Sequence, residues 1–359
     1  MNNKDIPIFE GAICPVPINH EENVVIGHGS GGRMTHELIA KVFKYYFGNP
    51  ILNTSNDFAS LSLPNEANLK GRLSVSTDAH VINPIIFPGG DIGRLAVAGT
   101  VNDICMSGGI PLYLTISFII EEGLPIETLR IITQSIKETA IEAGVQIIAG
   151  DTKVVEKGKV DKLFISTAGI GWIPKGREIG GQFAKPGDAV LLSGSIGDHG
   201  IAVLAARGDL KFNTTLQSDV APLNKLIEIL LQAIPHVHVL RDPTRGGLAT
   251  SLNEIAQQSN VAFELNEDSI PVKQEVRAAC EMLGFDPLYV ANEGKVIVIL
   301  PASDVDSALA SLRSHPLGKS ACLIGMVKQN QEPLVVMKTH IGATRIVDML
   351  SGEILPRIC

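Results

Sequence analysis

Residues 112–120, 125–144 and 145–151 read LYLTISFII, PIETLRIITQSIKETAIEAG and VQIIAGD, and this succession decides the fold class. The first segment has the apolar composition of a strand. The second predicts an amphipathic helix, because proline is favoured at a helix start and glycine just beyond a helix end. The third predicts a buried strand that ends on Asp151. The sequence therefore predicts a strand–helix–strand unit with an acidic residue at its end.

Further strands and helices alternate on both sides of this unit. Strands are predicted at 72–78, 162–172, 189–194, 236–241, 295–300, 320–327 and 333–337, and helices at 34–47, 89–107, 195–208, 248–259 and 303–314. Because no long parallel strand–helix–strand run occurs, we predict an α+β fold (α/β sandwich type) with two domains. We expect an arm over 1–23, domains over 24–180 and 181–337, and a flexible tail over 338–359.

Composition narrows the function class. A chain of 359 residues with 45% hydrophobic and 19% charged residues is typical of a globular enzyme with two cores. The net charge of −8 argues against nucleic acid as a partner. No apolar run of membrane-spanning length and no signal pattern occurs, so we expect a cytoplasmic protein. The five cysteines contain no CxxC pair, which favours reduced thiols over disulfides or structural zinc.

Four aspartates lie at predicted element ends among small residues: Asp57, Asp78, Asp103 and Asp151. Any one of them alone is more simply a turn or cap residue. Acids that converge at strand ends, however, suit Mg²⁺, which takes a few carboxylates together with substrate phosphates. The set therefore predicts a magnesium site, provided that the four side chains converge.

A glycine-rich stretch, VVIGHGSGGR over 24–33, leads into the first predicted helix. Glycines let backbone N–H groups approach an anion, so phosphate binding is one interpretation and a plain flexible loop is the other. Lys153 and Arg245 could neutralise a phosphate, and Glu293 could act as a general base or cap a turn. His28, His80 and His199 have no metal-ligand spacing, and we expect ordinary polar roles for them.

The chain ends in Pro356-Arg357-Ile358-Cys359. A terminal cysteine is either a stray residue or a nucleophile on a tether, because a free exposed thiol is otherwise a chemical liability. Ten extended residues reach about 35 Å, enough to carry a thiol between an internal site and a partner's surface.

Together these motifs resemble the ATP-binding superfamily of aminoimidazole ribonucleotide synthetase, thiamine-monophosphate kinase and selenophosphate synthetase. The stretches that carry the resemblance are the glycine-rich loop, Ser76-Thr77-Asp78, Pro88 to Gly93, Val101-Asn102-Asp103, Gly150 to Lys153, Asp242 to Leu248 and Ala291 to Gly294. With the terminal tetrapeptide added, the set is similar to the HypE family of hydrogenase maturation factors.

The resemblance implies an ATP-dependent dehydratase for [NiFe]-hydrogenase maturation. The S-carbamoyl group on Cys359 would be dehydrated to an S-cyanate (thiocyanate), whose cyanide is delivered as an iron ligand. It implies a homodimer formed through the N-terminal sheet. The carbamoyltransferase HypF would load the thiol, and a HypC–HypD complex would accept the cyanide.

On this basis we assign Cys359 as substrate carrier, Glu293 as base and Lys153 as electrostatic partner. Asp57, Asp78, Asp103 and Asp151 are the expected magnesium ligands. The expected ATP contacts are Gly27, Gly29, Ser30, Gly31, Gly32, Asp91, Asn102, Thr152 and Arg245.

Two alternatives remain open. One is another small-molecule kinase or synthetase of the superfamily, although the glycine-rich loop lacks the cysteine common in selenophosphate synthetases. The other is a non-catalytic nucleotide-binding scaffold that hands a metal to a partner through Cys359.

Overall fold

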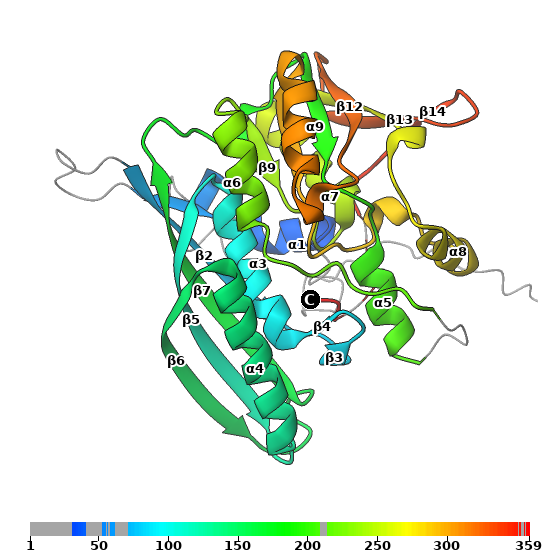
Figure 1. Ribbon diagram of the computed structural model, residues 1–359. Coiled ribbons are helices and arrows are strands. Elements are labelled where there is room, and N and C mark those ends of the chain that lie inside the picture. The colour runs from blue at the N-terminus through cyan, green and yellow to red at the C-terminus, as the bar shows by residue number, and fades with distance from the viewer. Residues whose placement is uncertain are drawn as a thin grey trace, which may run out of the picture.

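The N-terminal half is built on a five-stranded sheet. The computed structural model describes residues 31–40, 52–54, 56, 58–61, 71–208, 214–350, 352, 355 and 357–359. The strand order is β1-β2-β7-β5-β6, and only β5 and β6 run parallel. The bounds are β1 Ala59–Leu61, β2 Gly71–His80, β5 Ile110–Glu121, β6 Gln146–Val155 and β7 Leu163–Pro174. Helices α3 (Ile92–Met106) and α4 (Ile126–Ala143) cover one face (Figure 1).

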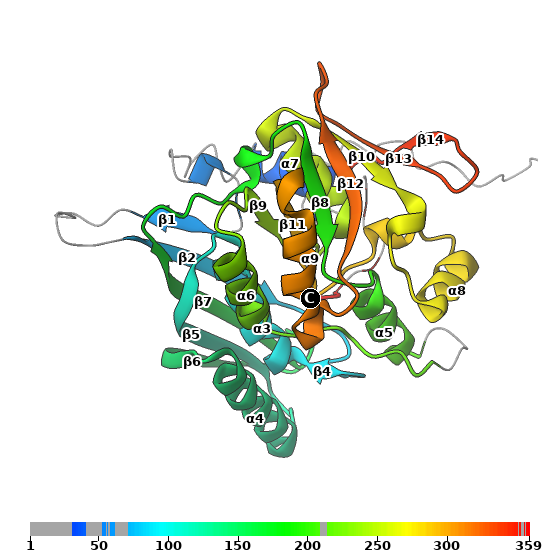
Figure 2. The same cartoon turned by 45° about the horizontal axis from the view of Figure 1, so that its top comes forward.

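The C-terminal half is built on a seven-stranded sheet with both faces covered. Its order is β14-β13-β10-β12-β8-β11-β9. The bounds are β8 Asp188–Leu192, β9 Val239–Arg241, β10 Ala262–Asn266, β11 Ile297–Pro301, β12 Cys322–Lys328, β13 Leu334–Lys338 and β14 Thr344–Ile346. Helices α6 (Asn224–Ala233) and α9 (Val305–Arg313) pack on one face, and α7 (Gly247–Ser259) on the other (Figure 2).

One apolar core joins the two halves. Along β8, Leu191 belongs to the cluster that contains α3, α4, α6 and α9, while its neighbours Val190 and Leu192 face the α7 cluster. This alternation follows from the strand period of two. The layers therefore run from the first sheet through two layers of helices to the second sheet and α7.

Shorter elements complete the described chain. They are α1 Arg33–Leu38, β3 Ile86–Phe87, β4 Gly90–Asp91, α5 Asp198–Ala206 and α8 Gln274–Leu283. Among the described residues no helix combines the length and apolar character that a bilayer span requires.

The α+β prediction is confirmed, and so is helix α4, which begins after Pro125 and ends at Gly144 in the left-handed conformation with φ 74°. The prediction of a buried strand ending on Asp151 is wrong. Strand β6 continues to Val155 and is largely exposed, because it is the sheet edge and α4 leaves it uncovered.

The prediction of a tail that starts at residue 338 also needs correction. Strand β14 pairs antiparallel with β13, and Val347 after it is fully buried. The second domain therefore extends to about this residue. The predicted arm over 1–23 lies outside the described residues.

Candidate functional site

The chain terminus is docked inside the molecule. The N–H group of Val81 donates to a carboxylate oxygen of the terminal residue Cys359 at 3.0 Å, and that of Asn83 donates to the carbonyl oxygen of Arg357 at 3.3 Å. Ile358 between them is only 3% exposed. Figures 1 and 2 both place the C-terminus among the packed elements near α5. The terminal cysteine therefore lies beside the residues that follow β2 in the chain.

Glu293 is a buried carboxyl beside several other acids. It is 4% exposed, and its Oε1 has no hydrogen-bond partner among the described residues. Burial raises the pKa of Glu293 well above its usual value, the charges of Asp219, Asp242 and Asp78 raise it further, and Arg245 partly opposes them. These residues come from three segments far apart in sequence, because Asp242 and Arg245 belong to the same one. A carboxyl with a raised pKa is suited to general acid–base chemistry.

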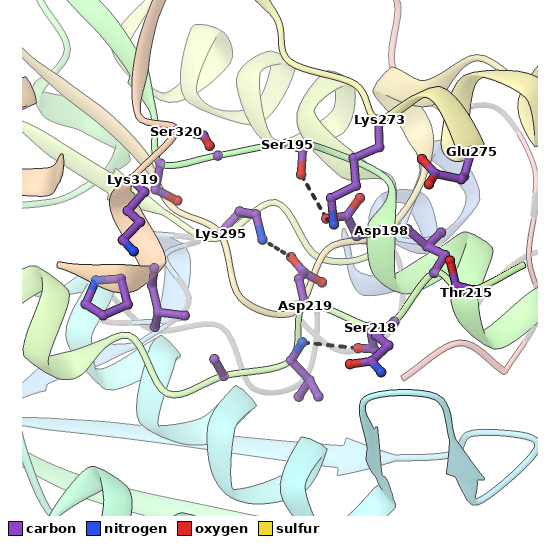
Figure 3. Close-up of a pocket in the computed structure, with 18 of the residues that line it drawn as sticks. Ser195, Asp198, Thr215, Ser218, Asp219, Lys273, Glu275, Lys295, Lys319 and Ser320 are labelled. Atoms are coloured by element: carbon purple, nitrogen blue, oxygen red, sulfur yellow. Dashed lines mark hydrogen bonds and ion pairs between the residues drawn. The ribbon is translucent and has the colours of Figure 1, made fainter.

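Asp219 holds the backbone of the Glu293 loop. Its carboxylate accepts from the N–H groups of Glu293 and Gly294 at 3.0 and 3.3 Å and forms a 2.8 Å ion pair with Lys295 (Figure 3). Burial opposes ionisation of Asp219, but Lys295 lowers its pKa overall. Sequence reasoning missed both residues, because Asp219 lies in no motif and Lys295 follows the Ala-Asn-Glu-Gly motif as an ordinary lysine.

The glycine-rich loop reaches the same region. Gly31 has φ 77°, and a Cβ there would lie 3.2 Å from Cβ of Arg245. Arg245 also lies within electrostatic range of His80, whose imidazole is 3.5 Å from Asp78. Burial is the main cause that lowers the pKa of His80. The structure thus brings Gly31, Asp78, Arg245 and Glu293 into one region.

Asp78 and Asp103 lie where β2 packs against α3. Ser76 Oγ donates to Asp103 at 2.6 Å. A Cβ on Gly99 would lie 3.3 Å from Asp78 Oδ2, and Gly99 is one helical turn before Asp103. Two of the four predicted magnesium ligands therefore lie at the same contact between β2 and α3. Asp57 lies outside the described residues, as do Gly27, Gly29 and Ser30.

Asp151 and Lys153 lie elsewhere. Asp151 pairs in register with Ser117, which pairs with Ser166 on β7, itself opposite Ala79 on β2. Asp151 therefore shares a sheet face with Ala79, and Asp78, its neighbour in β2, points to the opposite face. The strands that carry Asp151 and Asp78 are also three strand spacings apart, which is ~14 Å. The predicted convergence with Asp78 and Asp103 is therefore wrong within one chain. The described residues contain no cluster of three acidic, histidine or cysteine side chains placed to hold a metal.

Lys153 is paired with Asp151 rather than with Glu293. Its Nζ lies 2.6 Å from Asp151 Oδ2, and both side chains are about two-thirds exposed. This ion pair, with the Thr152 N–H, lowers the pKa of Asp151. The three adjacent residues thus form an exposed polar group on the edge strand.

Asn102 joins the two domains. Its amide donates to the carbonyl oxygens of Ala221 and Glu293 at 3.2 and 3.4 Å and accepts from the Leu223 N–H at 2.8 Å. Its hydrogen-bonding groups are engaged by protein backbone. The predicted ATP contact is therefore replaced here by a role in positioning the Glu293 loop.

Asp91 and Gly32 also have local structural roles. Asp91 caps α3 by accepting from the N–H groups of Gly93 and Arg94 at 2.7 and 3.0 Å. A Cβ on Gly32 would lie 2.2 Å from the Leu350 carbonyl oxygen. Gly32 therefore allows a close backbone contact, and these two positions are explained without a nucleotide.

Comparisons with known proteins agree with these motifs. The N-terminal domain model of AIR synthase related protein matches residues 57–173, and the C-terminal domain model matches residues 185–338. The carbamoyl dehydratase HypE of Cupriavidus necator is 52% identical over 344 residues, which are 96% of this chain and 97% of that protein.

Solved structures show the same likeness. A chain in a crystal structure of a HypE–HypF complex is 49% identical with a TM-score of 0.82, and the match covers 87% of this chain and 99% of that one. A crystal structure of HypE in complex with ATP is 50% identical with a TM-score of 0.78 and coverages of 92% and 98%. The chain therefore belongs to the HypE family of carbamoyl dehydratases, within the AIR synthase related proteins.

Proposed function

We propose that this chain uses ATP to dehydrate an S-carbamoyl group on its own Cys359 to an S-cyanate. The observation that supports this best is the docked terminus. Cys359 bonds to Val81, three residues after Asp78, and Asp78 lies within electrostatic range of Glu293. The docked terminus thus contacts a residue three positions along the chain from an acid that interacts with the proposed base.

The chemistry requires an activated oxygen, because hydroxide is a poor leaving group. The carbamoyl oxygen attacks the γ-phosphorus of ATP in line, and the bond to ADP breaks. Loss of both N–H protons and of the phosphorylated oxygen then leaves S–C≡N. S-Carbamoyl and ATP thus give S-cyanate, ADP, hydrogen phosphate and one proton.

Glu293 is the proposed base for an N–H proton. Its raised pKa makes the ionised form a stronger base than an ordinary carboxylate. Arg245, beside Gly31, is the proposed contact for the phosphates of ATP. An ATP complex is known for a relative that is 50% identical.

The magnesium proposal rests on two carboxylates. Asp78 and Asp103 lie at the contact between β2 and α3 and supply the hard oxygen ligands that Mg²⁺ prefers. Two carboxylates suit this ion, which usually keeps several waters and binds substrate phosphates. When bound, magnesium would supply positive charge to offset the charge of the phosphates.

A homodimer would give Asp151 and Lys153 a place in the site. On the face of the sheet that carries Lys153, strand β5 exposes Ile110, Tyr113 and Ile119. Ile119 is directly opposite Lys153 in the register. Apolar surface of this kind marks an interface. We therefore infer that two copies pack through this sheet face, so that Lys153 of one copy serves the ATP of the other.

The partners follow from the same chemistry. A relative forms a complex with HypF, and we propose HypF as the carbamoyltransferase that loads Cys359. A HypC–HypD complex is the proposed cyanide acceptor, which passes the ligand to iron during [NiFe]-hydrogenase maturation. Because the reaction needs ATP and a reduced thiol, we place it in the cytoplasm.

The test is a mass measurement on the terminal peptide. The complete protein is incubated with the carbamoyltransferase, carbamoyl phosphate and Mg-ATP, and the C-terminal peptide is analysed. We expect carbamoylation followed by loss of one water for each ATP cleaved. A carbamoylated peptide that never loses water in the presence of Mg-ATP would refute the proposal.

A further inference from the structure

His199 contacts the docked terminus directly. It lies in the first turn of α5, has no exposed surface and meets the Phe87 ring edge-on at a centroid distance of 5.5 Å. Its Nε2 is 2.7 Å from the carbonyl oxygen of Ile358, and its Nδ1 is 2.7 Å from Ser218 Oγ. A buried histidine thus joins the last but one residue of the chain to the loop before Asp219.

The hydrogen-bond partners of the His199 imidazole determine which ring nitrogen carries the hydrogen. A carbonyl oxygen can only accept, so Nε2 of His199 carries the hydrogen. Burial lowers the pKa of His199 more than the charge of Asp219 raises it, so the ring is neutral. Nδ1 therefore accepts from the Ser218 hydroxyl, whose oxygen in turn accepts from the Val220 N–H at 3.1 Å.

Arg207 contacts the neighbouring tail residue. It follows the last residue of α5, and its Nη2 donates to the carbonyl oxygen of Arg357 at 2.7 Å. Its Nε donates to the carbonyl oxygen of Asn83 at 2.8 Å, so the same side chain also bonds to the segment on which the tail lies. His199 and Arg207 thus place two donors from one helix on consecutive tail carbonyls.

The rest of the protein holds the tail through main-chain oxygens of three consecutive tail residues. The carbonyl of Arg357 accepts from Arg207, the carbonyl of Ile358 accepts from His199, and the terminal carboxylate of Cys359 accepts from the Val81 N–H. Ile358 adds a buried side chain. Because these hydrogen bonds involve backbone atoms rather than the Cys359 sulfur, they do not depend on what the sulfur carries.

We propose that His199 and Arg207 are positioning residues that hold the terminus in its docked state, whether the thiol is free or loaded. Neither residue needs to touch the reacting atoms. The consequence for dehydration rests on the proposed function, whereas the docking itself does not. Release of these carbonyls would expose Cys359 to a partner.

The test compares His199→Phe with His199→Gln in the complete protein. Phenylalanine keeps the contact with Phe87 but removes the donor, whereas glutamine keeps an N–H near the Nε2 position. Alkylation of Cys359 by iodoacetamide is followed on the C-terminal peptide. We expect alkylation about 10-fold faster in His199→Phe and near the wild-type rate in His199→Gln, since a buried carbonyl loses its partner only in the former.

Two further variants complete the design. His238→Phe removes another histidine hydrogen bond, to Asp188, and should leave Cys359 alkylation unchanged. Ile358→Asn disfavours docking from the tail side, without altering the body of the protein, and should accelerate alkylation as His199→Phe does. Wild-type alkylation rates in both His199→Phe and Ile358→Asn would overturn the proposal.

A second readout separates positioning from general damage. In single-turnover experiments on preloaded protein, His199→Phe should slow dehydration about 10-fold, whereas loading of the thiol by the carbamoyltransferase should not slow. Equal losses in loading and dehydration would contradict a positioning role. If wild-type protein itself never dehydrates, the proposed function fails, and the alkylation rates still decide the docking.

Discussion

Replacing Glu293 with glutamine tests the proposed base and its electrostatic environment together. The substitution keeps the shape of the side chain and removes its basicity. Loss of a general base costs about 10²- to 10⁴-fold in rate, so dehydration of preloaded protein should fall by that factor. ATP binding and loading of Cys359 should be unchanged, because neither requires a proton acceptor at this position.

The same variant should change stability with a defined sign. The pKa of Glu293 is raised by burial in the folded protein, while the unfolded chain titrates near the ordinary value of 4.5. The folded state therefore binds more protons above pH 4.5, and wild-type stability falls as pH rises through this window. Glutamine has no such dependence. Relative to wild type, Glu293→Gln should gain about 1.4 kcal/mol per pH unit until the folded pKa is passed.

The assay is chemical denaturation of both proteins between pH 5 and pH 8, with single-turnover dehydration followed by peptide mass. Glu275→Gln, an exposed carboxylate on the pocket beside Asp219, is the matched control and should match wild type in both measurements. Dehydration within 3-fold of wild type would remove Glu293 from the role of base. A stability difference that does not widen with pH would refute the electrostatic reasoning.

Two other predictions follow from the fold. If Lys153 acts across a dimer, an equal mixture of inactive Lys153→Ala and Glu293→Gln chains that exchange subunits should recover about a quarter of wild-type dehydration. Half of the dimers are then mixed, and each mixed dimer has one intact site of two. No recovery would place both residues in the site of one chain. Asn102→Leu should lower the free energy of unfolding by about 1–3 kcal/mol in denaturant titrations, because it leaves the Leu223 N–H unpaired, whereas exposed Gln134→Leu should not.

The parts of the fold that could be predicted from sequence have local causes. The boundaries of helix α4 are determined by residues at its ends, because Pro125 precedes its first turn and Gly144 adopts the left-handed conformation at its end. The burial of β6 has no local cause. Ile147 and Ile148 have the apolar character of core residues, yet they are 40% and 55% exposed, because no helix in the described part of the chain covers the edge strand.

The candidate site likewise contains residues that could be predicted from sequence and residues that could not. Asp78, Arg245 and Glu293 belong to motifs of polar and glycine residues that are visible in sequence. Asp219 is 74 positions from Glu293, and His199 is 159 positions from Ile358. Neither lies in a motif that points to its partner, so only the three-dimensional arrangement reveals them.

The docked terminus is held by contributions that nearly balance. Four hydrogen bonds to main-chain oxygens of the tail, from Val81, Asn83, His199 and Arg207, contribute about 1 kcal/mol each. Burial of the Ile358 side chain adds about 2–3 kcal/mol. Fixing three residues and their side chains opposes this with about 5–6 kcal/mol of conformational entropy. The two states therefore differ by only a few kcal/mol, which is the condition that a carrier needs. A much tighter dock would keep Cys359 from a loading enzyme, and a looser one would leave its cargo away from Glu293.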